Sequence, residues 1–112
     1  MNININDKDY ELNFGIGFLR EIDKVAGLDV NGVSMGMGMS KTLPAIQSYD
    51  MLALINVIYS ATHACNPRPG IQDIEEYIGT LKDKDVEKLF TDVVKELKKS
   101  PVTRFQMNKM AQ

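Results

Sequence analysis

Residues 51–64 constrain the fold more than any other part of the chain. This stretch is apolar almost all round, which is the pattern of a helix buried on every side. Asp50 is a good N-cap for it, and the proline-rich loop 66–70 cannot continue it. Its apolar run, residues 51–58, is far too short to cross a bilayer. The other elements must therefore cover this helix as the centre of the core.

The first fifteen residues have the pattern of a β-hairpin. Apolar and polar residues alternate on either side of an Asn/Asp cluster at residues 6–9, as expected for two strands with one buried face. The apolar positions are Ile3, Ile5, Tyr10, Leu12 and Phe14. Because two strands are marginal in isolation, we expect this hairpin to pack against helices.

Apolar residues at helical spacing predict further helices over residues 16–26, 40–46, 71–81 and 83–99. Ser40 is the candidate N-cap of the second helix. Gly27 is placed for a left-handed cap at the end of the first, and Pro101 stops the last. The predicted fold is α+β and mostly α, with the hairpin 1–15 packed on a bundle of about four to five helices. We expect one globular domain over residues 1–100 and a weakly patterned C-terminal tail over 101–112.

Charge and cysteine content exclude several classes of function. The net charge of −2 leaves no basic surplus for neutralising phosphates, so nucleic acid is not an expected partner. A single cysteine, Cys65, allows no intramolecular disulfide and suits a reducing compartment. The N-terminus lacks the basic start and apolar run of a signal peptide. We therefore expect a cytoplasmic protein without a membrane partner.

Two motifs could carry chemistry, but each is incomplete. Gly15 and Gly17 lie between a predicted strand and helix, where a dinucleotide-binding turn would be. That fingerprint needs a small residue where this chain has Arg20. His63 and Cys65 are possible metal ligands, but a structural zinc site needs four ligands and the chain has no second His or Cys. We interpret the glycines as a strand-to-helix corner and predict no cofactor and no metal.

The acidic residues Asp73, Glu75 and Glu76 are best explained as solvated charge near a helix start. Carboxylates can act as acid and base where a cleft perturbs them, but nothing in the pattern places these in one. The sequence therefore predicts a protein that is not an enzyme.

Methionine is the unusual feature. Met35, Met37 and Met39 alternate with glycine in the least regular part of the chain. Flexible thioether side chains suit partner surfaces that vary, but they also fill gaps in a protein's own core, and both interpretations stay open. Three further apolar residues lie in the tail without a clear period: Phe105, Met107 and Met110. We hypothesise that these six residues contribute to a partner-binding surface.

The order of these segments resembles a family of tail assembly chaperones from long-tailed, siphovirus-type bacteriophages and prophages of Gram-positive bacteria. No single motif is decisive, but the matching stretches are collinear over residues 1–100. They are the opening 3–23, the glycine–methionine region 31–38, residues 57–62, the Pro67-Arg68-Pro69 loop, the acidic helix after it and the closing 90–100.

This resemblance implies a function in virion assembly. Such chaperones are thought to coat the tape measure protein, a long helical chain that sets tail length. They keep it soluble and help recruit tail tube subunits, act in the host cytoplasm and are absent from the mature virion. The resemblance leaves open whether the chain forms homo-oligomers and whether a longer, frameshifted form is made.

Two alternatives remain at this stage. The chain could be another phage accessory protein, such as a head–tail connector or a scaffold-like protein. It could also be a small regulatory module that binds a host protein. The composition of purified virions separates the first alternative from a chaperone, and the proteins captured from infected cells separate the second.

Overall fold

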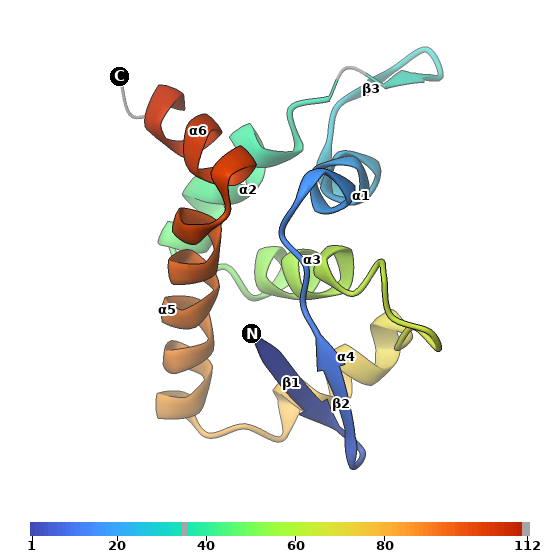
Figure 1. Ribbon diagram of the computed structural model, residues 1–112, viewed down its shortest axis with the longest axis vertical. Coiled ribbons are helices and arrows are strands. Elements are labelled where there is room, and N and C mark those ends of the chain that lie inside the picture. The colour runs from blue at the N-terminus through green and yellow to red at the C-terminus, as the bar shows by residue number, and fades with distance from the viewer. Residues whose placement is uncertain (35, 111–112) are drawn as a thin grey trace.

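The N-terminal hairpin is present as predicted. The structure is a computed structural model that describes residues 1–34 and 36–110. Strand β1 (Asn2–Ile5) pairs antiparallel with β2 (Lys8–Glu11) (Figure 1). Asn6 and Asp7 have φ of 53° and 65°, the two left-handed residues of a type I′ turn. The inward face of the hairpin and the segment after it is buried at Ile3, Ile5, Leu12 and Phe14.

Helix α1 (Ile16–Ala26) follows the hairpin. Gly27 is its C-cap, but with φ −75° and ψ 178° the residue is extended, so the prediction of a left-handed cap is wrong. Close packing requires the glycine instead. A Cβ at Gly27 would collide with the carbonyl oxygen of Asp23 and lie 2.7 Å from that of Gly36.

A second, very short hairpin lies in the region without regular pattern. Strand β3 (Asp29–Val30) pairs antiparallel with β4 (Val33–Ser34). The turn residues Asn31 and Gly32 both have positive φ, 53° and 80°. Asn-Gly is the preferred sequence of a type I′ turn, so the signal for this hairpin was present in the sequence and was missed.

Helix α2 (Gly38–Gln47) begins two residues earlier than Ser40, the predicted cap. Helix α3 (Met51–Ala61) is the central element that the sequence predicted, although it ends three residues before residue 64. The carboxylate of Asp50 accepts hydrogen bonds from the backbone N–H groups of Leu52 and Ala53, at 2.9 and 3.2 Å. This is the predicted N-cap.

After residue 70, the regular elements of the described chain are all helices. Helix α4 (Ile71–Gly79) packs on α3, and α5 (Asp83–Lys99) leads directly into α6 (Pro101–Met110). Pro101 ends α5 as predicted and occupies the first position of α6, where a missing N–H costs nothing. Helix α6 lies where the sequence showed no clear period. It contacts α5 and α2, and the domain boundary expected at residue 100 remains a prediction.

The fold class is confirmed: one globule, mostly helical, with an N-terminal two-stranded hairpin. The described residues contain six helices, one more than the upper end of the expected range. Helix α3 lies at the centre between α1, α4 and the hairpin, while α5 and α6 form a column along the longest axis (Figure 1). Leu54, Val57, Ile58 and Ala61 of α3 are fully buried. Within the described residues no helix is both long enough and apolar enough to span a bilayer.

Candidate partner-binding site

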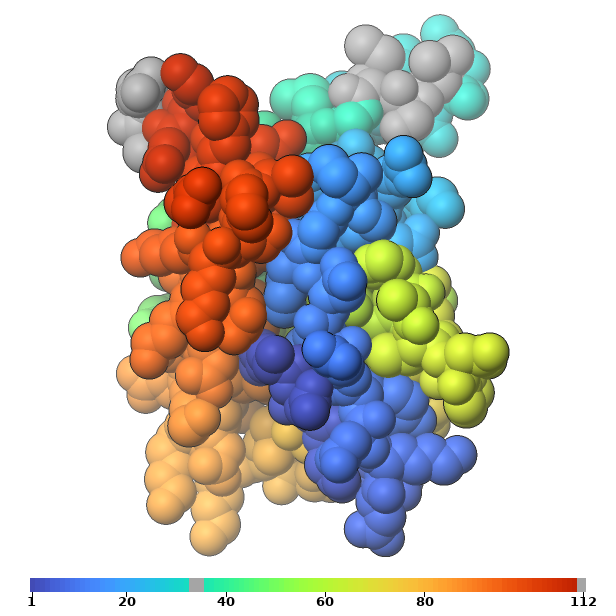
Figure 2. Space-filling model, in the orientation of Figure 1, coloured from blue at the N-terminus to red at the C-terminus, as the bar shows by residue number. Residues whose placement is uncertain are grey.

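Four of the six residues predicted to bind a partner line one groove. Met37, Met39, Phe105 and Met110 meet there, between the start of α2 and the helix α6, around a hollow of about 290 Å³. Figure 2 shows α6 and the segment that carries β3 as two projections at the same end of the molecule, with the residues that begin α2 between them. We call this hollow the α6 groove. Residues about 70 positions apart in the chain are thus brought together.

A second hollow, of about 570 Å³, lies where α6 faces the body of α2. Met107 and Met110 line it together with Leu43 and Pro44. Since Met110 borders both hollows, they flank the same helix. Met35, the remaining predicted residue, lies outside the described residues.

Exposure divides the predicted residues into two classes. Phe105 and Met37 are 62% and 52% exposed, and Met110 is at 36%. Met107 is half-buried against the core, and Met39 is a core residue at 4%. Met39 therefore fits the interpretation that methionine fills the protein's own core, while partner binding by Met37 remains a prediction. Met37 is available to a partner, whereas Met39 is used by the fold.

The start of α2 is held in place from α1. The backbone N–H of Gly38 donates to the Asp23 carboxylate at 2.8 Å, which satisfies a helix N-terminal donor from fifteen residues away. A Cβ at Gly38 would lie 2.6 Å from that carboxylate and 2.8 Å from the carbonyl of Ile22, so only glycine fits. Met37 precedes it with φ 69°, a left-handed conformation that is uncommon for a large side chain. A bulky exposed residue in a strained conformation is a candidate for function.

Helix α6 is anchored at its first turn by hydrogen bonds and further along by Met107, which packs against the core. The Ser100 hydroxyl donates to the Phe14 carbonyl at 2.7 Å, and the buried Thr103 hydroxyl donates to the Leu97 carbonyl. Among the described residues of α6, Thr103 is the one that is fully buried. Beyond the first turn, Phe105 and Met110 are exposed, whereas Met107 packs against the core.

The two hollows beside α6 have a cationic edge. Lys98 and Arg104 line one, and Lys109 lines the other with its ammonium 5.7 Å from the Phe105 ring centroid. The acidic side chain among the described lining residues, Asp23, is already hydrogen-bonded to Gly38. This surface suits an apolar partner that carries carboxylates beside its apolar stripe.

The glycine pair is a structural corner. Gly15 precedes α1, and its N–H donates to the Asn13 side chain at 2.9 Å. A Cβ at Gly17 would collide with the imidazole of His63. The glycines lie at the predicted strand-to-helix corner, and the structure adds that Gly17 allows close packing against His63.

Cys65 and the acidic residues are also accounted for by the fold. The Cys65 thiol donates to the Glu11 carbonyl at 3.4 Å. Asp73 accepts from the Gly70 N–H at 3.1 Å, at the start of α4, while Glu75 and Glu76 are exposed. In the described part of the chain, no three His, Cys, Asp or Glu side chains come together as metal ligands.

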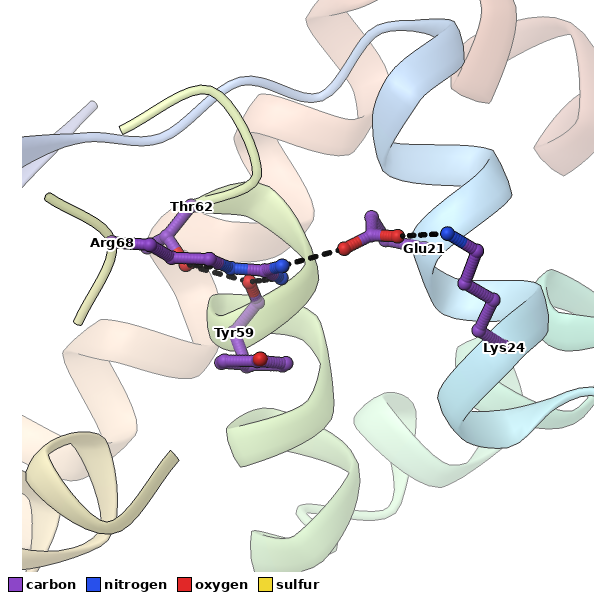
Figure 3. Close-up of polar contacts among 5 residues, drawn as sticks. All are labelled: Glu21, Lys24, Tyr59, Thr62 and Arg68. Atoms are coloured by element: carbon purple, nitrogen blue, oxygen red, sulfur yellow. Dashed lines mark hydrogen bonds and ion pairs between the residues drawn. The ribbon is translucent and has the colours of Figure 1, made fainter. Parts of the chain in front are cut away.

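A polar cluster that the sequence did not reveal fixes the 66–70 loop. Figure 3 shows the Arg68 guanidinium reaching between α3 and α1. It donates to Glu21 at 2.7 Å and to the Tyr59 carbonyl at 2.7 Å, and it stacks 3.9 Å from the centroid of the Tyr59 ring. Hydrogen bonds from Lys24 and Arg68 lower the pKa of Glu21. The proline-flanked Arg68 thus ties the 66–70 loop to α3 and α1, and it is not among the residues that line the α6 groove.

Comparison with known proteins gives a match to a family model over almost the entire chain. A family model described as "Phage tail assembly chaperone protein, TAC" matches residues 2–112. No curated protein matches the chain, and neither does any solved structure. The matched span includes every helix and strand described above, so the similarity concerns the whole fold and not one motif.

Proposed function

The chain belongs to the phage tail assembly chaperone family, a family of non-catalytic chaperones, and on that premise we propose that it binds the tape measure protein. In this proposal the protein works in the cytoplasm of a Gram-positive host during assembly of a siphovirus-type tail. It keeps the tape measure protein soluble and helps recruit tail tube subunits around it. It leaves before the virion is complete.

The observation that carries the proposal is the α6 groove with its cationic edge. A long helical protein waiting for its tube exposes apolar stripes that would otherwise aggregate. Met37, Phe105 and Met110 offer adaptable apolar contacts for such a stripe. Arg104 and Lys109 stand beside them for the carboxylates that flank it. Affinity per copy can be modest, because many copies along one partner gain from multivalency.

Co-expression with the tape measure protein tests this proposal. The variant Met37→Asn/Phe105→Ser changes two exposed side chains of the groove and leaves the buried Met39 in place. We expect it to stay folded but to lose both co-purification with the tape measure protein and the soluble fraction of that protein. The matched control is Ile71→Ser, which removes an apolar side chain that is 38% exposed at the start of α4.

Three outcomes are informative. If the groove variant folds and still keeps the tape measure protein soluble, the binding face is elsewhere, and the acidic helices between residues 71 and 99 are the next surface to test. If the wild-type protein does not solubilise the tape measure protein at all, the proposed partner is wrong. Mass spectrometry of purified virions separates the chaperone from a connector, since a connector would be present in a fixed small number of copies.

A further inference from the structure

A second exposed apolar surface lies at the other end of α2. Tyr49, Met51, Val86 and Phe90 line a hollow of about 440 Å³ between the α2–α3 corner and α5. Tyr49 is 58% exposed and Met51 40%. We call it the Tyr49 face. None of its residues lines the α6 groove, so it is a separate feature of the molecule.

Tyr49 combines an exposed ring with an uncommon backbone conformation, which makes it a candidate for function. Its φ is 60°, a left-handed conformation that glycine or asparagine adopts at lower cost. Backbone bonds already fix the corner, with Tyr49 N–H donating to the Ile46 carbonyl at 3.1 Å and Asp50 N–H to the Ala45 carbonyl at 3.0 Å. The ring stands edge-on to the buried Phe90, 5.3 Å between centroids. Its outer face is left to solvent.

The charge of the Tyr49 face is opposite to that of the α6 groove. Residues 83, 86, 87 and 90 are spaced so that they share one side of α5, and the charged ones among them, Asp83 and Glu87, are both acidic and exposed. Neither forms a salt bridge with another residue in the described part of the chain. The nearby Lys88 is paired with Asp92 at 2.7 Å. Unpaired carboxylates beside an apolar hollow favour a cationic partner.

We propose that the Tyr49 face binds an amphipathic protein segment with Lys or Arg beside its apolar stripe. An apolar side chain of the segment packs against Tyr49 and Met51, and its cations lie against Asp83 and Glu87. The protein then has two docking surfaces of opposite charge at opposite ends of α2, and one copy can hold two partner segments at once. This inference stands independently of which protein fills the α6 groove.

Two designed helical peptides test the charge preference. Both carry the same leucine stripe and a fluorescent label, but one has lysine and the other glutamate at the flanking positions. The α6 groove would also take the glutamate peptide, so the comparison uses the full chain with Met37→Asn/Phe105→Ser, which removes that competing site. Fluorescence anisotropy should then show tighter binding of the lysine peptide, and the preference should shrink as salt rises. Equal binding of the two peptides would overturn the proposal.

Substitutions then locate the site. Tyr49→Asn should weaken binding of the lysine peptide by about tenfold or more, as removal of a central aromatic contact does. Its melting temperature should stay close to that of the wild type, because relief of the left-handed conformation offsets the lost ring contact with Phe90. Glu87→Lys should reverse the preference between the two peptides. The matched control is Glu76→Lys, the same charge change on an exposed residue of α4, which should leave the preference intact. Unchanged binding in Tyr49→Asn would place the peptide elsewhere and refute the assignment.

Two further measurements identify the occupant. Phe105→Ser should not change binding of the lysine peptide, and this assay contains no tape measure protein, so a failure here is distinguishable from a failure of the proposed function. If sedimentation shows self-association that Tyr49→Asn abolishes, the face binds a second copy of this chain, and the proposal of a separate cationic partner is wrong.

Discussion

Helices α3 and α6 are of similar length and both carry large apolar side chains, but they use them differently. In α3, Leu54, Val57 and Ile58 are fully buried between α1 and α4. In α6, Phe105 is 62% exposed, and the fully buried residue among those described is Thr103, a polar one. Burying apolar area stabilises the folded state by roughly 25 cal/mol per Å². The apolar residues of α3 therefore stabilise the fold, while most of those of α6 remain available for a partner.

This difference also indicates which residues of so small a chaperone can be substituted without unfolding it. A small domain has little stability to spare. If its binding surface were built from core residues, every substitution that altered binding would also change the stability of the fold. In α6 the exposed side chains, Phe105 and Met110, are different residues from those that pack, Thr103 and Met107. Binding a partner and keeping the fold stable can therefore depend on different side chains. Substitutions in the two regions should therefore affect different measurements.

The largest effect is expected in α3. Leu54→Ala or Ile58→Ala removes a side chain that is fully buried and should lower the free energy of unfolding by ~2–5 kcal/mol. Chemical denaturation measures the loss. Leu52→Ala is the matched control, since Leu52 lies on the same helix but is 71% exposed, and it should change stability by less than ~0.5 kcal/mol. Equal effects at Leu52 and Leu54 would mean that the core has been assigned wrongly.

An intermediate effect is expected at the start of α2, which belongs to the core on one side and to the α6 groove on the other. Gly38→Ala would place a Cβ 2.6 Å from the Asp23 carboxylate and 2.8 Å from the Ile22 backbone. Overpacking of this kind should cost ~1–3 kcal/mol, measured by chemical denaturation.

The control for Gly38 is Gly79→Ala. A Cβ at Gly79 meets no atom of the described chain within 4 Å, and its φ is not in the left-handed region. Alanine there should be neutral or stabilise by up to ~1 kcal/mol. A stable Gly38→Ala variant would show that α1 does not hold the start of α2 as tightly as the geometry indicates.

The sequence predicted the parts of the fold that rest on local pattern. Asp50 marked the start of α3, period-two alternation marked the N-terminal hairpin, and Pro101 marked the end of α5. Each is a property of neighbouring residues. The β3–β4 hairpin was equally local, with Asn31-Gly32 at its turn, and only the recognition of that turn was lacking.

The parts that rest on contacts between distant segments could not be predicted. Asp23 caps α2 from another helix, and Arg68 binds Glu21 across 47 residues. Helix α6 lacks a clear apolar period because its packed residues, Val102, Thr103 and Met107, include a polar one, while the apolar Phe105 is exposed. Nor could the sequence tell the buried Met39 from the exposed Met37. Both are methionines beside glycine, and only the position of α1 makes them different.

A smaller effect is expected from the polar cluster that holds the 66–70 loop against α3. Hydrogen bonds from Lys24 and Arg68 lower the pKa of Glu21 below its usual 4.5. A carboxyl group with a depressed pKa stabilises the folded state above its unfolded pKa, and this stability is lost as the pH falls through the folded pKa. Glu21→Gln removes the titrating group. The melting temperature of the wild type should therefore exceed that of the variant by a constant margin between about pH 7 and pH 5, and the margin should shrink below about pH 4.5.

The comparison for Glu21→Gln is Glu75→Gln, an exposed carboxyl group on α4. The difference in melting temperature between Glu75→Gln and the wild type should not shrink as the pH falls below about 4.5. If the difference in melting temperature between the wild type and Glu21→Gln stays constant down to about pH 3, the ion pair contributes nothing measurable to stability, as is true of many surface ion pairs.

The smallest effect on stability is expected at Met37, and it tests the division between fold and partner surface most directly. Met37 is 52% exposed and left-handed at φ 69°, whereas Met39, two residues on, is 4% exposed. Met37→Asn loses a half-exposed side chain but relieves a conformation that costs a large residue roughly 1–2 kcal/mol, so the two effects should nearly cancel. Met39→Ala should instead cost ~2–5 kcal/mol, as for a buried methionine elsewhere. Thermal unfolding of the two variants side by side measures the contrast. If Met37→Asn destabilises the protein as much as Met39→Ala does, Met37 belongs to the core like the residues of α3, and the α6 groove loses one wall of its proposed binding surface.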